Sequence, residues 1–193
     1  MRSRRLAVTL GFLLLTLAGW SQQSHRPHST TPPAESAPTG EDTTELETFS
    51  RAVALQARPD QLRYFQSAID STDAALQQSR ELQRLPAAAI NIPNLNAQSL
   101  KLRDVLDDVE HYNAVLVASL SKLQESEFKK LTKRLRKSYS IVASEARTVS
   151  QQLEPGMAVP DRLRSSAANL EKALSDFRSD QIRLGREMGI QSK

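Results

Sequence analysis

The sequence predicts an all-α protein, an antiparallel helical bundle of three to four major helices with a long central helical segment. The first observation is the composition, because helix-forming residues dominate, only 5% of residues are aromatic, and glycine is rare. The second is the segment Ala97–Leu153, which lacks proline and glycine and carries apolar residues at steps of three or four. These are Leu102, Leu106, Val109, Leu116, Leu120, Leu123, Leu131, Leu135, Tyr139, Val142, Ala146, Val149 and Leu153. Such an apolar stripe has to be covered by partner helices.

The prolines supply a third, independent observation. Beyond residue 40 they all fall where the periodicity alone would begin or end a helix. They are Pro59, Pro86, Pro93, Pro155 and Pro160. Agreement between two unrelated signals supports the predicted number of helices.

Residues 1–20 read as a signal peptide or an uncleaved anchor. A short basic start, Met1–Arg5, precedes the uncharged, leucine-rich stretch Leu6–Trp20, which is short for a membrane span but suits an export signal. Cleavage fits after Ala18 or after Ser21. The sequence therefore predicts export to the periplasm or the extracellular space. Because the chain has no cysteine, it excludes lipidation, disulfides and thiolate metal ligands.

The residues after the signal divide into a tether, a folded part and a tail. Residues 21–42 are rich in proline, serine and threonine and predict a disordered tether, since they cannot bury enough apolar surface to offset the ordering entropy. Residues 43–190 form the predicted bundle, and 191–193 form a short tail. Without the three arginines of the signal, the remaining charge of the chain is nearly balanced.

The first two predicted helices carry short apolar stripes. Residues 44–47 fit a capping box at the start of a helix that ends near Ala57. Its apolar side holds Leu46, Phe49 and Val53. Pro59 suits the first position of the next helix, which spans about 60–85. The inner face of that helix is predicted to hold Leu62, Phe65, Ile69, Leu76 and Leu82, and an irregular connection over 87–96 follows.

Two interpretations of residues 97–153 stay open: one continuous rod, or two helices with a break near Ser119–Ser121. A second capping-box match at Ser121–Gln124 favours the break. After the turn at residues 155–160, a helix over 161–188 has the most regular apolar positions in the chain, with Gln181 as the one polar member and Gly189 as its C-cap. Folding it back should place Phe177 near Leu135 and Leu170 near Val142.

A basic run is the one candidate binding site. It comprises Lys129, Lys130, Lys133, Arg134, Arg136 and Lys137. The functional interpretation is a patch for an anionic partner such as a membrane surface. The alternative is a solvated helix face balanced by Asp176 opposite Lys137 and Asp180 opposite Lys133. Aromatic residues for base stacking do not interleave the run, so specific nucleic-acid recognition is not expected.

No pattern in the sequence predicts catalysis, a cofactor, a metal site or a small-molecule substrate. Asp108 and His111 have the spacing of a metal-binding pair on a helix, but the second copy that a di-metal bundle needs is missing. The periodicity also turns His111 away from the predicted core. A nucleophile elbow and a phosphate-binding glycine loop are both missing from the sequence.

Two pentapeptides resemble a motif of the Spy/CpxP-type periplasmic chaperones, a Leu-Thr-x-x-Gln repeat at two helix starts. Residues 120–124 (Leu-Ser-Lys-Leu-Gln) and 57–61 (Ala-Arg-Pro-Asp-Gln) are each followed by a phenylalanine four residues on. The resemblance implies a helical stress-response chaperone as one alternative. The sequence otherwise predicts a non-enzymatic cell-envelope interaction or adaptor module with an unknown protein partner or self-association. An anionic-surface binder acting through the basic run is the second alternative.

Overall fold

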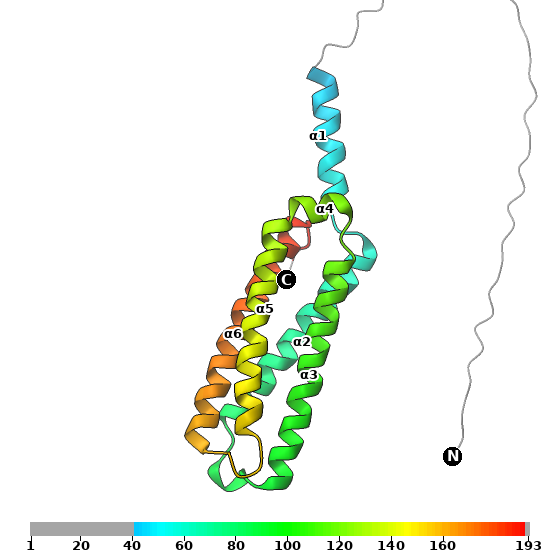
Figure 1. Cartoon of the computed structure of the whole chain (residues 1–193). Coiled ribbons are helices and arrows are strands. Elements are labelled where there is room, and N and C mark those ends of the chain that lie inside the picture. The colour runs from blue at the N-terminus through cyan, green and yellow to red at the C-terminus, as the bar shows by residue number, and fades with distance from the viewer. Residues whose placement is uncertain (1–40, 192–193) are drawn as a thin grey trace, which may run out of the picture. The chain divides into compact units, whose positions relative to one another are not determined.

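The computed structural model describes residues 41–191, and within this range every regular element is helical (Figure 1). The all-α prediction is therefore confirmed. The elements are α1 (Glu41–Leu55), α2 (Pro59–Gln83), the short 3₁₀ helix η1 (Ala87–Ala89), α3 (Ile92–Ala118), α4 (Lys122–Glu127), α5 (Lys129–Gln152) and α6 (Pro160–Glu187). The predicted signal and nearly all of the predicted tether lie outside the described residues.

Four long helices, α2, α3, α5 and α6, lie side by side, and each runs opposite to the one before it (Figure 1). We name them the helical body. Helix α2 packs against both α3 and α6, and α5 packs against α6. Helices α3 and α5 contact each other less than these pairs do. We name the space between them the α3–α5 seam, and side chains of both helices line it.

The core of the helical body is built from the predicted stripes. Leu135, Leu170 and Phe177 are all fully buried, and the ring centroids of Tyr139 and Phe177 lie 5.6 Å apart. The expected fold-back of the last helix onto the preceding one therefore agrees with the structure. Gly189 follows the C-cap of α6 with a φ of 73°, a conformation that glycine adopts without strain.

Several boundaries and one inner face differ from the predictions. Helix α1 starts at Glu41, ahead of the predicted capping box. Helix α3 starts at Ile92, with Asn91 as its N-cap and Pro93 in the first turn, so the irregular connection is shorter than expected. Leu62, predicted to face inward, is 43% exposed, because Gln61 takes the inward position.

The long segment is interrupted, in agreement with the interpretation that placed a break near Ser119–Ser121. Helix α3 ends at Ala118 and α4 begins at Lys122. A second interruption follows at Phe128, which is buried and separates α4 from α5. Leu123, a predicted member of the apolar stripe, is 36% exposed, and Gln124 is the buried residue of the short helix α4.

The two halves of the helical body repeat the same inward positions. Buried residues of the α2–α3 half correspond one to one with buried residues of the α5–α6 half, at a constant separation in sequence number. The first set is Leu95, Leu102, Val109, Asn113, Leu116 and Leu120, and the second, in the same order, is Leu163, Leu170, Phe177, Gln181, Leu184 and Met188. Each half thus carries one amide at the same level of an otherwise apolar face.

Helices α2 and α6 approach closely at Gly185. A Cβ atom at that position would lie 2.5 Å from Cε2 of Phe65. The ring of Phe65 therefore occupies the space that a side chain at position 185 would need. A glycine near the end of a helix would not by itself have predicted this contact.

Candidate functional site

The basic run lies on the outer surface of the first half of α5, and all six of its side chains are exposed. Lys133 and Lys137 lie on the side of the helix opposite the buried Leu135. The run is therefore an exposed cationic face, and Arg134 also lines a hollow of about 560 Å³ with Arg183 and Arg186 of α6.

One member of the run is paired with the body of the protein. Arg134 Nε lies 2.7 Å from Oδ1 of Asp180, whose side chain is buried. The expected pairing of Asp180 with Lys133 is thus wrong by one residue, because α5 turns Arg134 rather than Lys133 toward α6. Among the described residues, the ion pairs include neither Asp176 nor Lys137, so the second expected match is not formed either.

Asp108 and His111 of α3 are not part of any group of three or more possible metal ligands within the described residues. Asp108 and His111 are both exposed. The His111 ring instead contacts Tyr112 edge-on, with a centroid separation of 5.1 Å. The structure thus places His111 away from the core, as the periodicity indicated.

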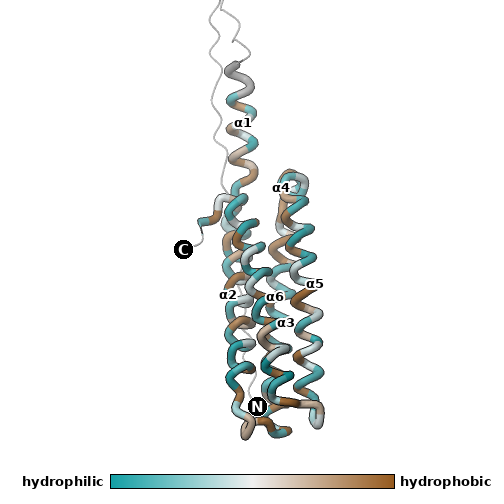
Figure 2. Tube along the Cα trace, turned by 90° about the vertical axis from the view of Figure 1, so that its left-hand side faces the viewer, coloured by the Kyte–Doolittle hydropathy of each residue, from teal (hydrophilic) through white to brown (hydrophobic). Residues whose placement is uncertain are grey.

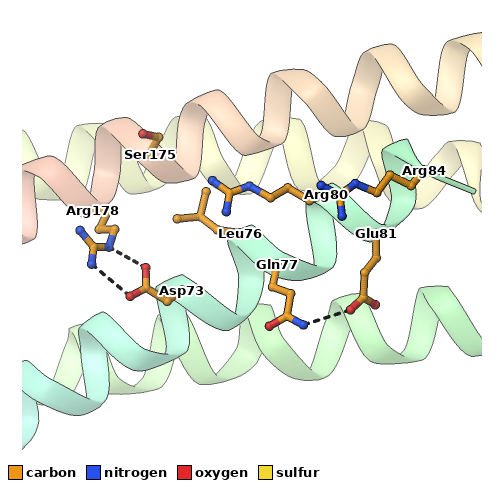
Figure 3. Close-up of a pocket in the computed structure, with 8 residues that line it drawn as sticks. All are labelled: Asp73, Leu76, Gln77, Arg80, Glu81, Arg84, Ser175 and Arg178. Atoms are coloured by element: carbon orange, nitrogen blue, oxygen red, sulfur yellow. Dashed lines mark hydrogen bonds and ion pairs between the residues drawn. The ribbon is translucent and has the colours of Figure 1, made fainter.

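A groove of about 650 Å³ runs along the outside of α2 and α6 (Figure 3). Its charged side chains largely neutralise one another. Arg178 donates to both carboxylate oxygens of Asp73, at 2.6 and 3.1 Å, and Figure 3 shows the two side chains meeting across the groove. Arg80 bonds Glu171 at 2.6 Å. These pairs clamp α2 to α6, and the groove is consistent with a structural role.

Hydrogen bonds from Arg80 and then from Gln83 hold the pKa of Glu171 below its usual range. A bond from Lys101 on α3 lowers the pKa of Glu81 in the same way. Helix α2 is thus joined to both of its neighbours by charged contacts at the surface.

A second groove, of about 300 Å³, follows the looser seam between α3 and α5. The hydroxyl of Tyr139 donates to Glu110 at 3.1 Å across this seam. Burial, and secondly Glu110, raise the pKa of Tyr139. Further along α3, Oδ1 of the buried Asn113 has no protein hydrogen-bond partner. The seam therefore has less complementary polar packing than the α2–α6 contact.

Two glutamines join four helix ends at one end of the helical body. Nε2 of Gln61 donates to Oε1 of Gln124 at 2.9 Å and to the Ser119 carbonyl at 2.8 Å. Nε2 of Gln124 donates to the carbonyls of Leu55 and Gln56, each at 3.2 Å. We name this cluster the glutamine junction; it connects the ends of α1 and α3 to the starts of α2 and α4.

The two glutamines occupy equivalent places in their helices. Each is the third residue of its helix and accepts from a backbone N–H at the helix start, that of Arg58 or of Ser121, at 3.0 Å. The capping-box pattern predicted the second of these contacts. It did not find the first, because arginine is not a typical N-cap residue. The contact between the two glutamines could not be predicted from either pentapeptide.

Helix α1 is the least covered element of the described chain. The described side chains are exposed along its length from Glu45 to Ala54, including the large apolar ones: Leu46 is 65% exposed, Phe49 69% and Val53 50%. Figure 2 shows α1 extending past the ends of the other helices, with hydrophobic positions along it. Near its C-terminal end, α1 contacts α4, where Arg51 pairs with Glu127, and Leu55 packs against the core beside the glutamine junction.

Comparison with known proteins found no matching family model, no matching curated sequence and no matching solved structure. Among residues 41–191, none of the helices is long and apolar enough to cross a membrane.

Proposed function

We propose that this protein is a non-enzymatic interaction module, exported by an N-terminal signal, in which an antiparallel helical bundle presents α1 to a partner. The observation that carries the proposal is the apolar side of α1, where Leu46, Phe49 and Val53 are all half-exposed or more. Large side chains on one side of a helix indicate a contact surface when no other element of the protein covers them. The proposal includes no catalytic step and no cofactor.

The glutamine junction supports this role mechanically. It bonds the last carbonyls of α1 to the N-terminal turn of α4, so the chain enters α2 in a fixed geometry. The helical body is then a rigid support, and α1 is the element that it holds out. We infer that the cell envelope or the extracellular space is where the partner is met.

The test is capture from an envelope extract by the immobilised mature chain, followed by identification of what is bound. A variant with Leu46→Gln, Phe49→Gln and Val53→Gln should lose the bound protein. A matched control, Leu100→Gln with Met157→Gln, removes apolar side chains that are 53% and 58% exposed at other sites and should retain it. Equal capture by both variants would contradict a role for α1.

A chaperone of the Spy/CpxP type is the second candidate, and the glutamine junction is the observation that favours it. The two pentapeptides that resemble the family motif occupy equivalent helix starts and meet through Gln61 and Gln124. Aggregation of an unfolded client should then be suppressed at ratios up to equimolar. A client that aggregates at its normal rate in the presence of the protein would exclude this candidate.

An anionic-surface role remains the third candidate, supported by the outward direction of the basic run. Its test is the binding of anionic vesicles at rising salt concentration. Because Arg134 is bonded to Asp180, charge reversal should be made at Lys133 and Lys137, which have no such partner among the described ion pairs. Binding that survives this reversal would exclude the run as the binding site.

A further inference from the structure

Helix α1 requires a cover that the described part of its own chain does not provide. It has 15 residues, a length at which an isolated helix is marginally stable in water. The described contacts of α1 with the helical body lie near its C-terminal end, and they are made by Arg51, by the partly buried side chain of Leu55 and by the carbonyls of Leu55 and of the following Gln56. A helix of this kind persists when another surface covers its apolar side.

The apolar side of α1 is narrow and has a shape that can complement itself. Leu46, Phe49 and Val53 are spaced by three and four residues, the two-position repeat of a helix that pairs with one other helix. A hollow of about 420 Å³ lies beside Phe49 and is lined also by Glu45, Thr48 and Ala52. Phe49 is thus next to a recess on its own helix. In a two-fold symmetric contact, the Phe49 side chain of each copy can fill the recess of the other.

The charges of α1 decide the direction of the pairing and argue against a membrane. Glu45 and Glu47 lie in the first half of the helix, and Arg51 is the basic residue of its second half. A parallel pair would bring these carboxylates together, and an anionic membrane would repel them. In an antiparallel pair, they lie alongside the other copy's junction end, where Lys122 and Lys129 occur with one carboxylate, Glu125, while Arg58 is paired with Asp60.

Resting on the proposed role of α1, we propose that the partner of this helix is a second copy of the same chain. The two α1 helices pair antiparallel around a two-fold axis that passes the apolar side of the helix between Phe49 and Ala52. Phe49 of each copy enters the hollow beside Ala52 of the other. Since few side chains hold the two copies together, we expect the dimer to be in reversible equilibrium with the monomer.

The first experiment is sedimentation equilibrium of the mature chain across two decades of micromolar concentration. We expect a reversible monomer–dimer equilibrium. Phe49→Asp should be monomeric throughout the range, whereas Leu100→Asp, at an exposed apolar site on α3, should dimerise as the parent chain does. A parent chain that is monomeric throughout would overturn the inference.

The second experiment tests whether the two helices pair antiparallel. Because the chain has no cysteine, each introduced cysteine can form a disulfide only with its copy in the other chain. Ala52→Cys should form a disulfide-linked dimer under mild oxidation, because this position lines the contact and is close to the two-fold axis. Leu46→Cys should not, because antiparallel pairing carries its two copies apart. A disulfide-linked dimer of Leu46→Cys would overturn the antiparallel arrangement. If the chain is monomeric but still captures an envelope protein through α1, the partner is not a second copy, and the proposed function is still supported.

Discussion

Gln61 and Gln124 meet through a hydrogen bond of 2.9 Å, although 63 residues separate them in the sequence. Both side chains are almost fully buried, and each also bonds backbone groups at helix ends. Buried amides are costly unless they are bonded, so this pair can exist only where four helix ends converge. The relationship fixes how α1 and α4 join the helical body.

Replacing Gln61 with alanine should therefore destabilise the protein far more than the same change at the surface. The change leaves the Arg58 N–H without its bond and removes the bonds that Gln61 donates to Gln124 and to the Ser119 carbonyl, which keeps only its bond from the Arg58 guanidinium, at an expected cost of about 1–3 kcal/mol. The measurement is urea unfolding. The matched control is Gln66→Ala on the exposed side of the same helix, expected within about 0.5 kcal/mol of the parent chain. Equal effects at the two sites would contradict the role of the junction.

Leu170→Ala should create a cavity between α5 and α6. The side chain is fully buried, so the expected loss is about 2–5 kcal/mol. Leu100→Ala is the control, because that leucine is 53% exposed and its removal leaves no cavity. Thermal and urea unfolding monitored by circular dichroism would measure both. A loss at Leu170 no larger than at Leu100 would refute the assigned packing.

Gly185→Ala should overpack the contact between α2 and α6. The added methyl group would stand 2.5 Å from the Phe65 ring, and forced repacking of this kind costs about 1–3 kcal/mol. Phe65→Leu in the same chain should recover part of the loss, since a smaller side chain vacates the space. Unfolding free energies of the two single variants and the double variant test the coupling. Additive effects would show that the two residues do not compete for that space.

Leucine substitutions at Asn113 and Gln181 should have opposite effects, although the two amides occupy equivalent positions. Oδ1 of Asn113 lacks a protein partner, so Asn113→Leu should stabilise the chain by about 1 kcal/mol. Gln181 accepts from Thr72 at 3.1 Å and donates to the Ala68 carbonyl at 3.3 Å, so Gln181→Leu removes two buried hydrogen bonds and should destabilise the chain, although the Thr72 hydroxyl keeps its bond to the Ala68 carbonyl at 2.8 Å. Urea unfolding of both variants measures the signs, and destabilisation by both would refute the difference.

The pair between Glu171 and Arg80 should make stability fall in acid. Because the pKa of Glu171 is lower in the folded chain than in the unfolded one, its contribution is complete above about pH 5 and is lost as the pH falls through the folded pKa. Melting temperatures of the parent chain and Glu171→Gln should differ near neutrality and converge at low pH. Glu154→Gln, at an exposed residue of the turn before α6, serves as the control. A difference that does not change with pH would exclude the ion pair as its source.

Much of the helical architecture could be predicted locally. The apolar positions of α6 and the prolines at helix starts depend on neighbours a few residues away, so periodicity and backbone chemistry located them. The break after Ala118 followed from a capping box in the same manner. The basic run could also be located, but only the packing of α5 on α6 selected Arg134 rather than Lys133 as the partner of Asp180.

By itself, the sequence determined that this chain is helical in its described part, where most helices begin and end, and which stripes become core. Tertiary structure alone decided that Gln61 points inward while Leu62 stays in water, that Asn113 lacks the partner that Gln181 has, and that α1 is left uncovered. The physical reason is the distance along the sequence between the residues that interact. Helix formation depends on residues one turn away, whereas burial and hydrogen bonding depend on which distant segments the fold brings alongside.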